Sequence, residues 1–155
     1  MDGRNPRSTA SIGGHPLHPM IIPFPIVCFV GTLVADIFYV SNHVQGWATA
    51  SNWLLGFGIG FAALAAVTGL TDYMGDDRIR RLGVALRHML ANVTAVVLEV
   101  VNFVIRLSDQ SKIDSIGIIL SAVTVVVLVY SGWLGGEMVY RHRVAVLDAS
   151  DDSAA

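Results

Sequence analysis

The chain has 155 residues, of which 54% are hydrophobic and 14% are charged, and its formal net charge is −2. A typical soluble chain is about 25% charged, so this composition is too apolar to cover a soluble domain of this size. The small net charge and the lack of a basic stripe exclude nucleic acid as an expected partner. The single cysteine, Cys28, excludes a disulfide framework and a cysteine-rich metal site. The composition therefore predicts an integral membrane protein in contact with the lipid bilayer.

Four apolar segments have the length of membrane-spanning helices. Crossing the hydrocarbon core takes roughly 20 apolar residues, and in lipid such a segment must satisfy its own backbone hydrogen bonds as a helix. Short polar connectors make neighbouring helices antiparallel. The prediction is an all-α, up-down-up-down four-helix bundle over residues 20–142, with spans at about 20–40, 53–71, 84–105 and 116–140. Residues 1–19 form a preceding tail, and residues 143–155 are expected to be a disordered acidic tail.

The Lys and Arg residues predict which side of the membrane the termini face. Connectors rich in these residues stay in the cytoplasm. Eight of them fall on the side of the termini and the second connector, namely Arg4, Arg7, Arg78, Arg80, Arg81, Arg87, Arg141 and Arg143. Only Arg106 and Lys112 fall on the opposite side. Both termini are therefore expected in the cytoplasm.

In this topology four of the five histidines fall at the cytoplasmic face. His15 and His18 precede the first span within His15-Pro16-Leu17-His18-Pro19, which proline stiffens by fixing φ near about −65°. His88 begins the third span and His142 follows the fourth. Converging histidines of a helix bundle are suitable ligands for haem iron or another metal ion. The alternative is that His15 and His18 are ordinary interfacial residues.

Three functions follow from this cluster, and the sequence leaves all three open. The first is a redox subunit that binds haem b, with His18 and His88 as axial ligands and His15 and His142 as alternates; covalent attachment is excluded because no C-x-x-C-H motif exists. The second is a protein that binds zinc, copper or iron without haem. Its candidate ligands are His15, His18, His88, His142, Asp72 and Glu137. The third is a structural or partner-binding membrane subunit without a cofactor.

Two carboxylates lie inside predicted spans. An ionised carboxylate there costs a few kcal/mol, so it pairs with a cation, takes up a proton or meets water. If Asp36 and Glu99 are neighbours, they share a proton and form a proton relay. Arg106, about two turns beyond Glu99, offers an ion pair as the alternative.

Two glycine pairs have the G-x-x-x-G spacing of close helix contacts. They are Gly56 with Gly60 and Gly132 with Gly136. We expect helices to pack closely at these four positions.

The stretch Gly14-His15-Pro16-Leu17-His18-Pro19-Met20, followed by Pro23-Phe24-Pro25, resembles the opening of the bacterial membrane family called domain of unknown function 2231. Other segments that fit the family are Gly69-Leu70-Thr71-Asp72, His88 with Asn92, and Gly132-Trp133-Leu134-Gly135-Gly136-Glu137 with Tyr140-Arg141-His142. The resemblance implies four spans in the bacterial inner membrane and no settled function. Some members are joined to a Rieske-type iron–sulfur domain, which implies a redox partner of that kind. A homo-oligomer is left open.

Overall fold

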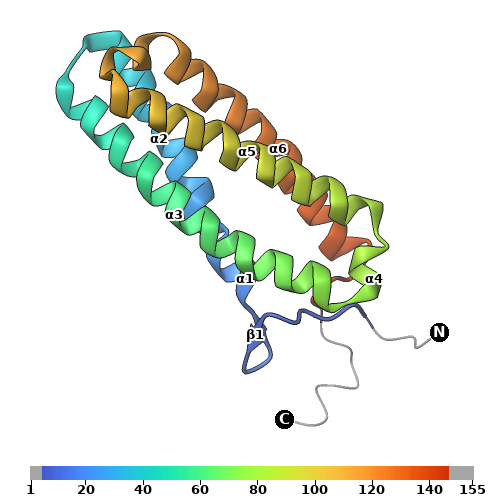
Figure 1. The fold of residues 1–155 in the computed structure, drawn as a ribbon. Coiled ribbons are helices and arrows are strands. Elements are labelled where there is room, and N and C mark those ends of the chain that lie inside the picture. Colours follow the sequence, from blue (N-terminus) through green and yellow to red (C-terminus); the bar gives the residue numbers. More distant parts are fainter. Residues whose placement is uncertain (1–4, 147–155) are drawn as a thin grey trace.

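Four long helices make up the computed structural model, which describes residues 5–146. The first is α2 (Pro23–Asn42), preceded by the short α1 (Leu17–Ile21); the others are α3 (Gln45–Gly75), α5 (Gly83–Ser108) and α6 (Ile116–Tyr140) (Figure 1). The smaller elements are strands β1 (Ser11–Ile12) and β2 (His15–Pro16), helix α4 (Asp77–Arg80) and the 3-10 helix η1 (Gln110–Asp114). Four helical spans are long and apolar enough to cross a membrane: α1 together with α2 (Leu17–Asn42), α3, α5 and α6.

The four helices form an antiparallel bundle, as predicted. α2 packs on α3 and on α6, and α5 packs on the same two helices, so α2 and α5 lie diagonally opposite. Both ends of the described chain lie at one end of the bundle, together with β1 and α4 (Figure 1). We call this the terminal end, and the other, which carries η1, the loop end. The all-α membrane bundle predicted from the sequence is confirmed.

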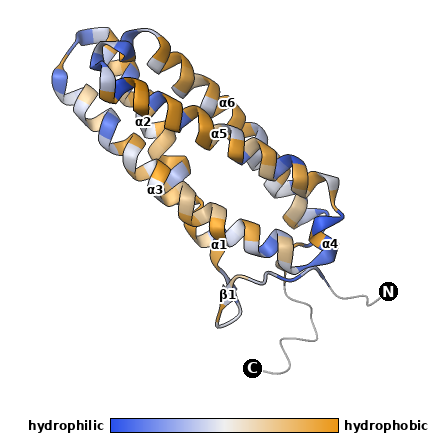
Figure 2. Cartoon of the chain, viewed as in Figure 1, coloured by the Kyte–Doolittle hydropathy of each residue, from blue (hydrophilic) through white to orange (hydrophobic). Residues whose placement is uncertain are grey.

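The packing of the bundle suits a lipid environment. Large apolar side chains face outward; Val126 is 69% and Trp133 74% exposed. The interior holds one small apolar cluster around Phe29 and Leu55, and otherwise mostly small or polar residues. Small residues let helices approach closely in lipid, and polar ones bond across helices. Apolar colour accordingly dominates the middle of the bundle in Figure 2, and hydrophilic colour its two ends.

Three of the four helical spans extend beyond their predicted bounds, whereas α6 begins and ends where it was predicted. α3 begins at Gln45, because a left-handed residue, His43 with φ 53°, turns the chain sharply after α2. A helix break at Ile22 separates α1 from α2, and Pro23 opens α2, where its missing N–H is harmless. Residues 147–155 of the predicted acidic tail lie outside the described residues.

The segment before α1 crosses the end of α3, and we call residues 5–10 the strap. Its backbone and Ser8 hydroxyl donate to Asp72 Oδ1, from Ala10 N at 2.7 Å and Ser8 Oγ at 2.8 Å. Arg7 N donates to Asp76 Oδ2 at 3.1 Å. Ala10 O then accepts from Leu17 N at 2.9 Å, across the hairpin of β1 and β2. The strap thus fixes where α1 begins.

Replacing Asp76 by asparagine is expected to destabilise the terminal end by about 1 kcal/mol at neutral pH. Asp76 accepts from Arg78 and from the strap, and the Arg78 guanidinium beside it lowers the pKa of its carboxyl from 3.8 to about 2. A lowered pKa stabilises the fold above the ordinary value, and this contribution is lost as the pH falls through about 2. Denaturant unfolding in detergent, compared between variant and parent, should show a difference that shrinks in acid. A constant difference would contradict this assignment.

Candidate functional site

His18 lies in α1 and its ring is held by α3. Its Nδ1 is 2.9 Å from the backbone oxygen of Ala65. Since a carbonyl oxygen only accepts, Nδ1 carries the hydrogen and donates. In the neutral ring this leaves a lone pair on Nε2.

His88 is held in the same way by α6. Its Nδ1 lies 2.9 Å from the backbone oxygen of Ser131 and therefore also donates. Asn92, one turn further along α5, places its amide nitrogen 2.9 Å from the His88 oxygen and 3.1 Å from His88 Nε2. Both of these bonds need the amide nitrogen as donor, so Nε2 of His88 is the acceptor and the ring is neutral.

The two rings meet edge to face between the helix pairs. Their centroids are 6.4 Å apart and their planes are nearly perpendicular, at 87°. His18 belongs to the α1–α3 side and His88 to the α5–α6 side, so the site joins the two halves of the bundle. Two imidazoles with Nδ1 bonded to backbone carbonyls have the arrangement that metal-binding histidines commonly show.

A glycine lies against each ring. A Cβ atom at Gly69 of α3 would be 2.9 Å from both Cε1 and Nδ1 of His18. A Cβ atom at Gly135 of α6 would be 3.3 Å from Cε1 of His88. The first distance is shorter than real side chains tolerate and the second is tight, so the absence of side chains here makes room for the imidazoles.

The other predicted ligands lie elsewhere. His15 is exposed on the hairpin, with Nδ1 3.0 Å from Gly13 O, and His142 is exposed beyond the end of α6. Asp72 holds the strap. Glu137 pairs with Arg141 one turn later, at 2.8 Å. Among residues 5–146, no three His, Cys, Asp or Glu side chains gather as a metal-ligand group.

A buried polar network occupies the loop-end half of the bundle. Arg106 of α5 forms a two-bond ion pair with Asp36 of α2, from Nη1 to Oδ1 at 2.8 Å and from Nη2 to Oδ2 at 2.6 Å. Both side chains are fully buried. Ser51 of α3 and Ser121 of α6 each donate to Asp36, at 2.5 and 2.8 Å. All four helices thus contribute to one charge-paired centre, and of the two interpretations of Asp36 its ion pair with Arg106 is the one present.

Glu99 lies beside this network without joining the ion pair. Its Oε2 accepts from Asn102 Nδ2 at 2.9 Å. Its Oε1 and the hydroxyl of Thr124 on α6 are both buried and have no hydrogen-bond partner within residues 5–146. The two groups are close enough to interact, although not in hydrogen-bond geometry.

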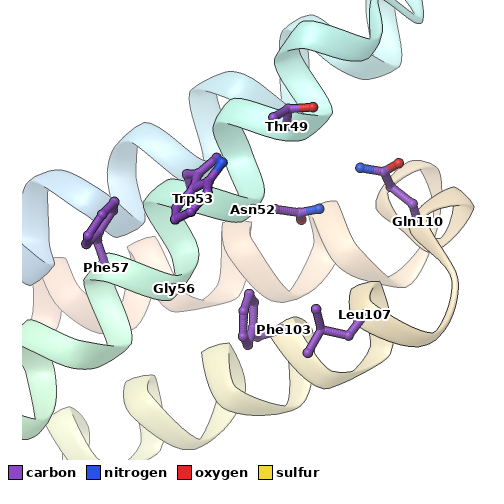
Figure 3. A pocket seen from close by; sticks show the side chains of 8 residues that line it. All are labelled: Thr49, Asn52, Trp53, Gly56, Phe57, Phe103, Leu107 and Gln110. Atoms are coloured by element: carbon purple, nitrogen blue, oxygen red, sulfur yellow. The ribbon is translucent and has the colours of Figure 1, made fainter.

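A groove of about 480 Å³ opens between α3 and α5 toward the loop end (Figure 3). Its walls are mainly apolar, with Trp53, Phe57 and Phe103, and the Asn52 side chain lies in it. The groove contains neither His18 nor His88, so it is separate from the histidine site.

Sequence reasoning found the two histidines but missed what holds them. The acceptors of their hydrogen bonds, Ala65 O and Ser131 O, are backbone atoms, which every residue has, so the sequence does not indicate them. The contact with Asn92 is indicated by the sequence, because a side chain four residues after His88 lies on the same helix face.

A family model described as "Predicted membrane protein (DUF2231)" matches residues 14–148. No curated protein and no solved structure matches the chain. The family match covers both histidines, the glycines beside them and the buried network.

Proposed function

Because the chain belongs to the DUF2231 family of predicted membrane proteins, which fixes its setting but not its chemistry, we propose a function from the site itself. The protein is a membrane electron-transfer subunit that binds haem b through His18 and His88. In this proposal the protein lies in the inner membrane of a bacterium, with its termini and the histidine site at the cytoplasmic face. Its redox partner is a protein of the Rieske iron–sulfur class.

The observation that carries the proposal is the pair of imidazoles, His18 and His88, which meet from the two halves of the bundle. Haem iron takes its equatorial ligands from the porphyrin and needs only axial groups from the protein. A zinc or copper site takes three or four protein ligands, and the described residues offer no such group. The donor set therefore fits haem better than a bare ion.

The haem would supply reversible one-electron chemistry of its iron. The protein's part is to fix both rings before binding. Hydrogen bonds from Nδ1 to Ala65 O and Ser131 O set the orientation of each ring, with Nε2 as the nitrogen left for a ligand.

The test is a visible spectrum of protein purified from haem-sufficient cells, oxidised and then reduced with dithionite. We expect a Soret band that sharpens and shifts on reduction, and its loss in His18→Ala and in His88→Ala. The matched controls are His15→Ala and His142→Ala, which remove exposed imidazoles of the same end and should leave the spectrum unchanged. A protein without the band, or a band that survives both site substitutions, would show the proposal to be wrong.

Asn92→Ala is expected to strengthen haem binding about fivefold. Asn92 donates to His88 Nε2, the atom that would hold the iron, so it competes with the ligand. Removing a competing hydrogen bond is worth about 1 kcal/mol, which is about a fivefold change in Kd. Haem titration of apoprotein, followed at the Soret band, measures this change; weaker binding would indicate that Asn92 supports the site instead.

A further inference from the structure

Glu99 is a buried acidic group for which the haem proposal has no use. It lies in α5 and is fully buried. The polar side chains of the neighbouring network are fully buried too, namely those of Asp36, Asn102, Ser121 and Thr124. It lies seven residues before Arg106, about 10 Å along the helix axis. The charged groups that act on it are Arg106 of its own helix and Asp36 of α2; the network's contributions from α3 and α6 are the neutral hydroxyls of Ser51, Ser121 and Thr124.

The charges of the network balance without Glu99. Asp36 and Arg106 neutralise each other in a two-bond pair. All three Arg106 nitrogens are occupied: Nε by Asn102 Oδ1, and the two Nη atoms by Asp36 and the hydroxyls of Ser51 and Ser121. An ionised Glu99 would add a buried negative charge with no counter-ion, which costs about 2.5–3.5 kcal/mol near the centre of a spanning helix.

The hydrogen bonds also fit a neutral Glu99. A carboxylate has two acceptor oxygens with about four lone-pair sites, whereas a protonated carboxyl has one O–H donor. Glu99 accepts one hydrogen bond, from Asn102 to Oε2. A hydrogen on Oε1 that the Thr124 hydroxyl accepted would satisfy both of the unpartnered atoms.

We propose that Glu99 is a proton-binding site in the membrane interior, which holds one exchangeable proton between its Oε1 and Thr124. The Arg106–Asp36 ion pair is the structural part of the network, and Glu99 lies outside it. The site shares no residue with the histidine pair, so it stands or falls independently of the haem proposal.

Infrared spectroscopy of the purified full-length protein in lipid vesicles tests the site. We expect the carbonyl band of a protonated carboxylic acid at neutral pH, which Glu99→Gln removes and which Glu137→Gln, at the Arg141 pair, leaves in place. Glu99→Asp should retain a shifted band, which separates loss of the acid from loss of the fold. Thr124→Val should shift the wild-type band, because it removes the proposed acceptor.

Exchange is tested by transfer to D₂O, where the band should move to lower frequency. The proposal is overturned if no band is lost in Glu99→Gln, or if the band does not move after equilibration in D₂O. It is also overturned if Na⁺ in place of a large organic cation abolishes the band, since the ligand would then be a metal ion.

Discussion

Replacing Arg106 by methionine is expected to lower the free energy of unfolding by about 3–5 kcal/mol. The substitution leaves the fully buried Asp36 carboxyl without its counter-ion. It also removes the donors to Asn102 and to the two serines that hold all four helices together. Methionine fills much of the volume of the arginine stem, so the loss measures mainly charge and hydrogen bonding.

Equilibrium unfolding in mixed detergent micelles, followed by circular dichroism, measures this change. The matched control is Arg141→Met, which breaks the ion pair with Glu137, in which the arginine side chain is 74% exposed. Exposed ion pairs contribute about 0–1 kcal/mol to stability, so this variant should lose no more than that. The double variant Asp36→Leu with Arg106→Met should be more stable than Arg106→Met alone, because no buried charge is left unpaired. Equal losses in the two single arginine variants would contradict a buried structural pair.

Introducing a methyl group at Gly69 is expected to weaken haem binding at least about tenfold, or about 1.4 kcal/mol. The new Cβ would lie 2.9 Å from two atoms of the His18 ring, so the ring must leave the bond to Ala65 O that orients it. Gly135→Ala should have a smaller effect in the same direction, because its contact with His88 is 3.3 Å.

Two glycines provide matched controls in the same helices. A Cβ at Gly60 of α3 or at Gly132 of α6 would meet no atom of residues 5–146 within 4 Å. Gly60→Ala and Gly132→Ala therefore share the gain in helix propensity, about 1 kcal/mol, without displacing a histidine. Haem titration of the four variants separates the two effects. A similar loss in Gly60→Ala and Gly69→Ala would show that the ring contact is unimportant.

The bundle was predictable because lipid imposes a strict requirement. Long apolar segments must be helices there, and short connectors make them antiparallel, so periodicity and length were enough. Which histidines meet was only partly predictable. His15 and His18 are three residues apart, but the β1–β2 hairpin turns at Gly13 and Gly14, with φ of 57° and 78°, and leaves His15 exposed while α1 carries His18 inward.

Contacts between segments that are far apart in the chain could not be predicted from the sequence. The pairing of Asp36 with Arg106 depends on α2 and α5 lying diagonally, and connector lengths do not fix the order of helices around a bundle. Of the G-x-x-x-G positions, a Cβ at Gly56 would contact Phe103 at 3.6 Å, as a close approach of α3 and α5 requires. The prediction was wrong for Gly60 and Gly132, where a Cβ would meet no described atom within 4 Å, and for Gly136, where it would meet only Tyr140 of the same helix. Close contacts occur instead at Gly58, against Phe29, and at Gly69, because spacing alone does not tell which face of a helix is inward.

The length of α3 has a consequence for the depth of the histidine site. Its 31 residues extend for about 46 Å, whereas bilayer hydrocarbon is about 30 Å thick. An upright α3 therefore stands out of the hydrocarbon by some 16 Å in total, and tilting takes up only part of this mismatch. Gly69 lies six residues, about 9 Å, before the end of this helix at Gly75. With this overhang shared equally between the two ends, about 8 Å at each, Gly69 and the His18 ring against it lie near the boundary between lipid tails and headgroups.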